Sequence, residues 1–529
     1  MTTKPFPEVT SRPVAIAAVA WIAVLGGIAA LLAWRWVGLQ GSDDNTYIQT
    51  GLDWIADFPS VGNSHWALRY PIVLPLAASL AVFGESFFSV GVVTAGYYAG
   101  TNILFVWFIA RHFDGLTAII WVLLINLLPN FLVSATYVNT DVPELFFVSA
   151  SLLTFAHYAL LPEAERSHRW LILSGIAAGL GFLVRETTLA LWLFLGLCFL
   201  VRPMFARWRY FVLGAAAVAV VASQSVYLGL MTGNFLYRQQ ISLHHDAVDR
   251  SAELQRVAQG GELVDTEGVL SVNVFLDPIL LLFVSQKFGF LFYLILGAAI
   301  ALALGAGRSL SPPQRRAMAL LGFAGLLWYG FISLAGPILY LVPRYMLFSG
   351  AALAVMPAWL AAAMLRRGGL ARHLAALGLI GYAATSWALL SVENVEPYFA
   401  ARRIPQIAGS VQEKVHVDAR LFARAQLDLR FSGLQNRVTT APPGPGDLVV
   451  GQPDLVRECE RSKYCTVTDE MRLYQPRPDW QEIFRVEPER RWIGRLLQAI
   501  GADRWMPRPI FRKIDNPNDP VILYRIPRA

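Results

Sequence analysis

Hydrophobic and polar positions alternate along this chain in long blocks. A first apolar run of about 25 residues covers roughly 13–37, and about 20 apolar residues are enough for a helix to cross a bilayer. Further apolar segments follow at 88–110, 115–133, 142–160, 170–184, 187–201, 210–231, 288–305, 317–335, 345–365 and 373–391. The pattern predicts an α-helical polytopic membrane protein with about eleven transmembrane helices.

Composition supports this interpretation. The chain is 55% hydrophobic and only 15% charged, which is too apolar for a soluble globule of 529 residues. The first apolar run lacks the small-residue cleavage pattern of a secretory signal, so we expect it to be a retained anchor.

The basic residues predict an orientation, because Lys and Arg concentrate on the cytoplasmic side of membrane proteins. With a cytoplasmic N-terminus, fourteen of the Lys and Arg residues before position 392 lie inside and eight lie outside, and "RPMFARWR" and "MLRRGGLARH" carry the difference most clearly. The net charge of +7 reports this bias, so we expect no nucleic-acid partner. A bacterial inner membrane with the C-terminus in the periplasm is the preferred location.

A shift in composition near residue 392 predicts two domains. Residues 1–391 form the transmembrane domain, with outer loops at 38–87 and 232–287, and 392–529 form a periplasmic soluble domain. The second part is richer in charge and contains "APPGPGD", the strand-like "LVVG" and "VILYRI", and the helical "RRWIGRLLQAIG", which suggests an α/β or α+β module. Cys459 and Cys465 could form a disulfide there, since a zinc site would need more ligands.

Ionisable residues near the membrane cluster on the outer side of the predicted spans, and the inner halves of the spans are nearly free of charge. The cluster consists of Asp43, Asp44, Arg69, Asp141, Glu144, Arg185, Glu186, Asp277, Lys287 and Arg344. An ion or proton pathway would place charges through the whole depth of the membrane. The one-sided distribution therefore favours a reaction site at the outer leaflet over a transporter.

Acids mixed with arginines suit the transfer of a group from a lipid phosphate. Guanidinium or ammonium groups stabilise the charge that grows on a leaving phosphate, and a carboxylate can take the proton of an acceptor. Asp43 or Asp44 is the candidate base. The candidate phosphate ligands are Arg69, Arg185, Lys287 and Arg344.

The order of several motifs resembles a known group. These are "SDDNTY", "HWALRYP", "VNTDVPELFF", "GIAAGLGFLVRETTLAL", "GNFLYR" and "PRYMLFSGAALAVMPAW". Together they resemble the GT-C superfamily of polyprenyl-phosphate-sugar-dependent glycosyltransferases, in the branch of protein O-mannosyltransferases and the aminoarabinose transferase of lipid A (glycosyltransferase family 39). The resemblance implies transfer of a sugar from a polyprenyl-phosphate-linked donor to a lipid, glycan or protein acceptor at the outer leaflet, by inverting displacement.

The resemblance also implies roles for individual residues. The acidic motif of the first loop falls on Asp43 and Asp44 with Tyr47 beside them, and it implies that Asp43 is the catalytic carboxylate. The late motif falls on Arg344 and Tyr345, and the basic residue after "GLGFL" is Arg185.

Two further acids, Asp141 and Glu186, are substrate-site candidates. The chain departs from the aminoarabinose transferases at Arg69, Tyr70 and Pro71, where those enzymes carry an acid and a lysine before the proline. The sugar and acceptor of those enzymes are therefore not carried over. No cofactor is certain, and a divalent metal is left open.

Each candidate has a simpler explanation. Asp43, Asp44 or Asp141 could cap a helix, and Arg185 could pair with Glu186 at a turn. Arg344 could anchor the interface, and Lys287 could extend its ammonium group toward it.

The loop "SLHHDAVDR" offers a weak metal candidate. His245 and Asp249 are four residues apart and could share one face of a helix, although a mobile loop that gates the acceptor fits better. A lipid-linked-sugar flippase or other transporter is the alternative function, and an assembly protein that works through its soluble domain is the third. Without a Gly-rich phosphate loop, a nucleotide-sugar donor is not expected.

Overall fold

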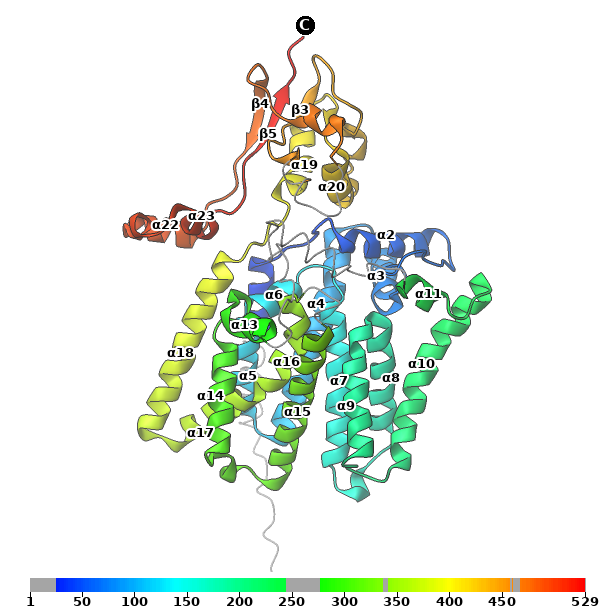
Figure 1. Ribbon diagram of the computed structural model, residues 1–529, viewed down its shortest axis with the longest axis vertical. Helices are drawn as coiled ribbons and strands as arrows, with labels where there is room; N and C mark the ends of the chain where they lie inside the picture. Colours follow the sequence, from blue (N-terminus) through cyan, green and yellow to red (C-terminus); the bar gives the residue numbers. More distant parts are fainter. Residues whose placement is uncertain (1–24, 244–275, 336–340, 457–458, 460–466, 529) are drawn as a thin grey trace, which may run out of the picture.

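The structure is a computed structural model that describes residues 25–243, 276–335, 341–456, 459 and 467–528. It consists of a bundle of helices with a smaller region of helices and strands that projects from one end (Figure 1). We call this end of the bundle the domain face and the opposite end the far face.

Long apolar helices form the bundle. Within the described residues, six segments are long and apolar enough to cross a membrane. They are α4 (Phe87–His112), α7 (Asp141–Leu160), α10 (Trp208–Thr232), α15 (Pro312–Ala335), the stretch Pro343–Arg367 and α18 (Gly369–Val392). The structure is therefore that of an integral membrane protein, and the number of about eleven spans stays a prediction.

Shorter apolar helices complete the bundle. They are Leu25–Trp34, α3 (Tyr70–Phe83), α5 (Gly115–Asn126), α8 (Arg169–Val184), α9 (Leu189–Leu200) and α14 (Leu291–Ala303). Two segments expected to be continuous are divided. The first separates into α5 and α6 (Pro129–Ser134), because Pro129 has no N–H for a continuing helix and suits a first helical turn. The second separates into α16 (Leu347–Leu353) and α17 (Val355–Arg367).

Helix α7 lies at the centre of the bundle and is buried along almost its whole length. It packs against α4 and α8, and Ser151 on α7 shares a hydrogen bond of 3.1 Å with Ser174 on α8. On α8, Gly175 lets α10 approach closely, because a Cβ there would lie 2.2 Å from the main-chain oxygen of Leu213. Helices α7, α8 and α10 thus pack closely side by side.

The predicted first outer loop is largely helical. It contains α2 (Asp43–Ala56) and α3, and Tyr47, Ile48 and Leu52 of α2 share a hydrophobic core with apolar residues of α3. Helix α2 lies across the domain face (Figure 1). In the second predicted loop, the described part contains α11 (Tyr237–Leu243), α13 (Leu276–Val284) and η3 (Gln286–Phe288).

The C-terminal region follows α18 and contains a five-stranded mixed sheet in the order β2-β1-β3-β5-β4. Its strands are β1 (Val415–His416), β2 (Val438–Thr439), β3 (Leu448–Val450), β4 (Gln481–Val486) and β5 (Val521–Arg525). The pairs of β1 with β2 and with β3 are parallel, whereas β5 pairs antiparallel with β3 and β4. Helices α19 (Phe399–Ser410) and α20 (Ala419–Phe431) bury their apolar residues against this sheet. The assignment of 392–529 as a separate periplasmic domain stays a prediction.

Candidate active site

The two adjacent acids of the first loop have different surroundings. Asp43 is the first residue of α2 and is exposed, whereas only 2% of Asp44 is accessible. The Asp44 carboxylate accepts the main-chain N–H groups of Gln40 (2.6 Å), Gly41 (3.3 Å) and Ser42 (2.7 Å). Burial raises the pKa of Asp44, and these N–H groups oppose that effect. Asp44 thus holds the turn that precedes α2, and Asp43 is left facing outward.

Tyr47 and Arg69 form the next part of the site. Arg69 donates from Nη1 to the Tyr47 hydroxyl at 2.6 Å, and its Nη2 contacts Nε2 of His65. His65 in turn contacts the Ser242 hydroxyl of α11 at 3.0 Å. Burial raises the pKa of Tyr47 to about 12, so its hydroxyl keeps its proton. Tyr47 also lies within the electrostatic reach of Asp43, Arg69 and Arg185, which places the first loop beside the second cluster.

Asp141 is the centre of that second cluster. Its two oxygens bind different arginines, with Oδ1 2.6 Å from Nη1 of Arg185 and Oδ2 3.0 Å from Nε of Arg344. The Arg185 guanidinium lies over the ring of Tyr345, 3.9 Å from its centroid. Sequence alone selected all four residues, and the structure brings them together.

Three separate elements supply these side chains. Asp141 begins α7, Arg185 lies between α8 and η2 (Glu186–Thr188), and Arg344 lies in η5 (Pro343–Met346). Thr140, not Asp141, is the N-cap of α7. The capping alternative for Asp141 is therefore wrong, because its carboxylate binds the two arginines.

Glu144 belongs to the charged cluster that the sequence predicted, but no individual role was predicted for it. It lies one turn after Asp141 on α7, accepts the hydroxyls of Thr187 and Thr188, and lies 4.0 Å from Arg185. The spacing of three residues from Asp141 was the available signal, since such residues share a helix face.

Glu186 does not pair with Arg185, so that alternative is wrong. Its carboxylate binds Arg238 at 2.9 Å, and Arg238 also donates to main-chain oxygens of Leu68, Phe182 and Leu183. Arg238 is buried and joins three segments, a role the sequence did not reveal. Glu186 therefore holds the buried Arg238 guanidinium in place beside the site.

Lys287 lies in a different set of contacts. Its ammonium group pairs with Glu393, which follows α18, and the main-chain oxygen of Glu393 accepts from Arg35. The structure thus brings Arg185 and Arg344 together at one carboxylate and connects Lys287 to the end of α18.

The metal and disulfide candidates are only partly covered by the structure. His245 and Asp249 lie outside the described residues, and within the described part no group of three or more His, Cys, Asp or Glu side chains is arranged to hold a metal. Cys459 is buried and disulfide-bonded. Cys465 lies outside the described residues, so its pairing with Cys459 stays a prediction.

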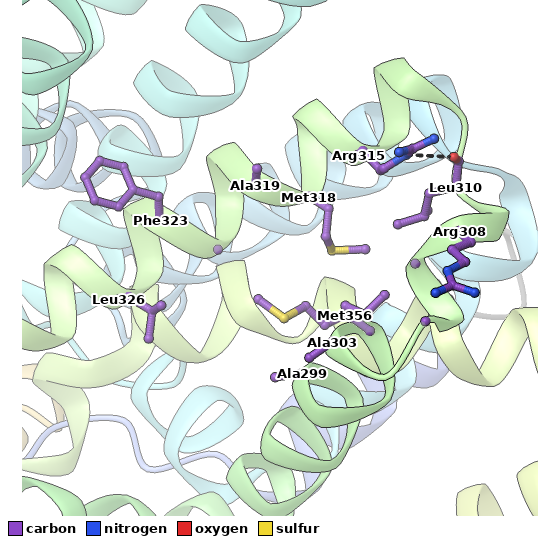
Figure 2. A pocket seen from close by; sticks show the side chains of 14 residues that line it. Ala299, Ala303, Arg308, Leu310, Arg315, Met318, Ala319, Phe323, Leu326 and Met356 are labelled. Carbon is purple, nitrogen blue, oxygen red and sulfur yellow. Dashed lines mark hydrogen bonds between the residues drawn. The ribbon is translucent and has the colours of Figure 1, made fainter. Parts of the chain in front are cut away.

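A groove of about 700 Å³ lies away from these clusters, between α14, α15 and α17. Figure 2 shows Met318 and Met356 facing each other across it, with Arg308 and Arg315 at one end. Its lining is mostly apolar, and none of the candidate residues belongs to it. The polar clusters of the domain face, and not this groove, therefore define the candidate active site.

Comparisons with known proteins give one match to a family model. Residues 71–227 match the family model described as dolichyl-phosphate-mannose-protein mannosyltransferase, and the matched segment includes Asp141 and Arg185. A search of curated proteins finds no significant match.

One solved structure shows the fold, and a second is similar to this chain as well. The crystal structure of ArnT from Cupriavidus metallidurans bound to undecaprenyl phosphate is similar with a TM-score of 0.53 and 14% identity, over 84% of this chain and 95% of that chain. The oligosaccharyltransferase AglB from Archaeoglobus fulgidus, in complex with an inhibitory peptide and a dolichol-phosphate, gives a TM-score of 0.49 and 14% identity, over 88% and 73% of the chains.

The family match and the fold together confirm the resemblance inferred from the ordered motifs. The family match covers part of the chain, and the structural likeness is one of fold, namely that of the GT-C membrane glycosyltransferases.

Proposed function

We propose that this protein is an integral membrane glycosyltransferase that takes a sugar from a polyprenyl-phosphate-linked donor at the outer leaflet of a bacterial inner membrane. The acceptor is a lipid, a glycan or a protein. The observation that carries the proposal is the bridging of Arg185 and Arg344 by the buried carboxylate of Asp141.

The exposure of these three side chains favours phosphate binding. Only 3% of the Asp141 side chain is accessible, against 12% for Arg185 and 24% for Arg344. The Asp141 carboxylate thus orients the two guanidinium groups, and part of each arginine side chain remains accessible. Planar guanidinium groups bind phosphate oxygens with two parallel hydrogen bonds, so a pair held in place is a suitable site for the donor phosphate.

Arg69 and Tyr47 extend this site toward the first loop. Arg69 is held by the Tyr47 hydroxyl and His65, and it adds a third cation near the leaving phosphate. Preorganised cations stabilise the charge that develops on phosphate as the bond to the sugar breaks. Lys287, which pairs with Glu393, is left out of this part of the proposal.

Asp43 is the proposed general base. It lies exposed at the N-terminal end of α2, where the helix dipole favours a negative charge. Its carboxylate takes the proton of the acceptor group as that group attacks the anomeric carbon. The bond from this carbon to the phosphate oxygen breaks in the same displacement, and the lipid phosphate leaves with the electron pair. A single displacement inverts the configuration of the sugar.

The test uses the full chain reconstituted in vesicles with lipid extract that contains polyprenyl-phosphate sugars, and follows product by mass spectrometry. Asp43→Asn is expected to lower transfer by about 10²- to 10⁴-fold while binding of undecaprenyl phosphate is kept. Asp53→Asn is the matched control, because Asp53 is an exposed acid of the same helix. Full transfer by Asp43→Asn would refute the base assignment, and movement of the donor across the membrane without transfer would identify a flippase.

A further inference from the structure

A helical hairpin in the C-terminal region stands apart from the rest of the molecule. It consists of α22 (Trp492–Ala499), η8 (Ala502–Trp505) and α23 (Arg508–Asp515). Figure 1 shows α22 and α23 projecting sideways from the sheet, beside the upper end of α18. We call residues 492–515 the lateral hairpin.

The lateral hairpin is firmly closed at its base. The Arg490 guanidinium binds the Asp515 carboxylate at 2.8 Å, and the Arg491 main-chain N–H donates to the main-chain oxygen of Asp515 at 2.9 Å. The helices cross so closely at Gly494 that a Cβ there would lie 2.1 Å from Oδ1 of Asp515. The two helices therefore act as one rigid unit.

Contacts with α18 fix the level of the hairpin. Both α22 and α23 contact α18, and the Arg491 guanidinium donates to the main-chain oxygen of Val392, the last residue of α18. Helix α18 is one of the candidate spans, and its 24 residues correspond to about 36 Å, slightly more than the apolar thickness of a bilayer. The end at Val392 thus lies at a bilayer surface, and the hairpin lies there too.

Large apolar side chains are exposed on the hairpin. Trp492, Leu496 and Ile500 follow one another at intervals of four residues, so they share one side of α22 and its end. Ile500 is 68% exposed and Trp505 is 90% exposed. Tryptophan is enriched where membrane and water meet, because its ring is apolar while its N–H is polar.

Positive charge accompanies these apolar groups. The lateral hairpin contains the exposed basic residues Arg495, Arg504, Arg508, Arg512 and Lys513. Its acids are Asp503 and Asp515, and Asp515 is already neutralised by Arg490. An amphipathic helix that combines exposed aromatic and aliphatic groups with basic side chains matches the chemistry of an anionic lipid surface.

We propose that the lateral hairpin is an interfacial membrane anchor. Trp492, Leu496, Ile500 and Trp505 lie among the outer ends of the lipid chains in the leaflet at the domain face, and Arg504, Arg508 and Lys513 contact anionic lipid phosphates. The anchor adds a second attachment of the C-terminal region to the membrane, beside α18. This proposal does not depend on whether the protein transfers a sugar.

The test measures the depth of a fluorophore on the full chain in vesicles. Trp505→Cys and, separately, Leu496→Cys are labelled with a bimane dye, and the unsubstituted protein supplies the background. Ile483→Cys is the matched control, because Ile483 is an exposed apolar residue on β4, a strand that lies away from the helical bundle (Figure 1). Fluorescence quenching of each dye is measured with two quenchers. One is a lipid that carries a spin label on its acyl chain, and the other is iodide in the water.

Spin-labelled lipid is expected to quench the dyes at 505 and 496 at least about threefold more than the dye at 483, and iodide is expected to show the reverse order. Equal behaviour at the three positions would overturn the proposal. Protection of 505 and 496 from both quenchers would also overturn it, because a protein partner would then cover the hairpin.

A second experiment tests whether the basic residues contact anionic lipid phosphates. Adding phosphatidylglycerol to phosphatidylcholine vesicles is expected to increase lipid quenching at 505, and the double variant Arg508→Gln and Lys513→Gln is expected to abolish that increase. An unchanged signal on adding phosphatidylglycerol would overturn the assignment of the basic residues to anionic lipid.

Discussion

At the scale of single residues, the site depends on how neighbouring acids differ in their surroundings. Asp43 and Asp44 are adjacent in sequence, yet Asp44 is buried under main-chain N–H groups and Asp43 is exposed. The sequence alone cannot show which of the two acids is buried, because the difference arises from how the turn 40–42 folds back over the Asp44 carboxylate.

This difference predicts opposite effects of two substitutions. Asp44→Ala removes the acceptor of three N–H groups and is expected to destabilise the protein by about 2–3 kcal/mol, whereas Asp43→Ala is expected to leave stability nearly unchanged. Thermal unfolding in detergent measures both. Equal melting temperatures for the two variants would contradict the structural role of Asp44.

A second prediction concerns the aromatic ring beneath Arg185. The guanidinium lies 3.9 Å from the centroid of Tyr345, and such a contact contributes about 0.5–2 kcal/mol. Tyr345→Leu is therefore expected to weaken binding of undecaprenyl phosphate by about two- to thirtyfold. Tyr293→Leu on α14 is the control, since Tyr293 is exposed and its hydroxyl donates to the main-chain oxygen of Phe283 on α13. The proposed phosphate site would be contradicted if both variants bound the lipid as the original protein does.

At the scale of elements, the sequence predicted the apolar segments well because their hydropathy is a local property. It placed one span across Pro129, although proline favours a first helical turn, and it did not predict α3 in the first loop, which packs against α2. It selected Asp141, Arg185 and Arg344 as separate candidates, but their contact joins positions distant in sequence. The predicted partner of Glu186, Arg185, was wrong for the same reason. Arg238 is distant from Glu186 in sequence and is brought next to it by folding.

Helix α20 of the C-terminal region is packed directly against the first loop. The Asn45 side chain donates to the main-chain oxygen of Ala423 at 2.9 Å, and Arg430 binds Glu85 through two hydrogen bonds of 2.6 and 2.7 Å. The turn before Asp43 thus lies between α2 and α20.

Gly41 makes this close packing possible. Its φ is +70°, and a Cβ would lie 2.4 Å from the main-chain oxygen of Arg424. Gly41→Ala is therefore expected to push α20 away from the turn and to lower transfer by at least about tenfold. Gly84→Ala is the matched control, because Gly84 has a φ of +77° with nothing within 4 Å, so it carries backbone strain of about 1 kcal/mol without the clash. Similar activity of the two variants would contradict a role of α20 in positioning Asp43.

At the scale of the whole molecule, the helical bundle and the C-terminal region meet at a buried set of charges. Asp428 of α20 is buried, interacts with Arg402 of α19, and also feels the negative charge of Asp44. The acid of the C-terminal region and the acid that holds the first-loop turn are therefore electrostatically linked across the interface.

This link predicts how stability changes with pH. Burial and, to a smaller extent, Asp44 raise the pKa of Asp428 to about 7 in the folded protein, although Arg402 opposes the shift; an unfolded aspartate has a pKa of about 3.9. The neutral carboxyl is thus favoured by folding. Its contribution is fully present below about pH 4 and is lost as the pH rises toward 7, by up to about 4 kcal/mol.

Asp428→Asn keeps a neutral group of the same shape at this position, so it is expected to remove this part of the pH dependence. The melting temperature of the variant should exceed that of the original protein at pH 8 and approach it at pH 4.5. Asp469→Asn, an exposed acid of the same region, should follow the original protein at both values. If Asp428→Asn is instead less stable at pH 8, the carboxylate is ionised in the folded protein, and its attraction to Arg402 outweighs its burial and the repulsion from Asp44.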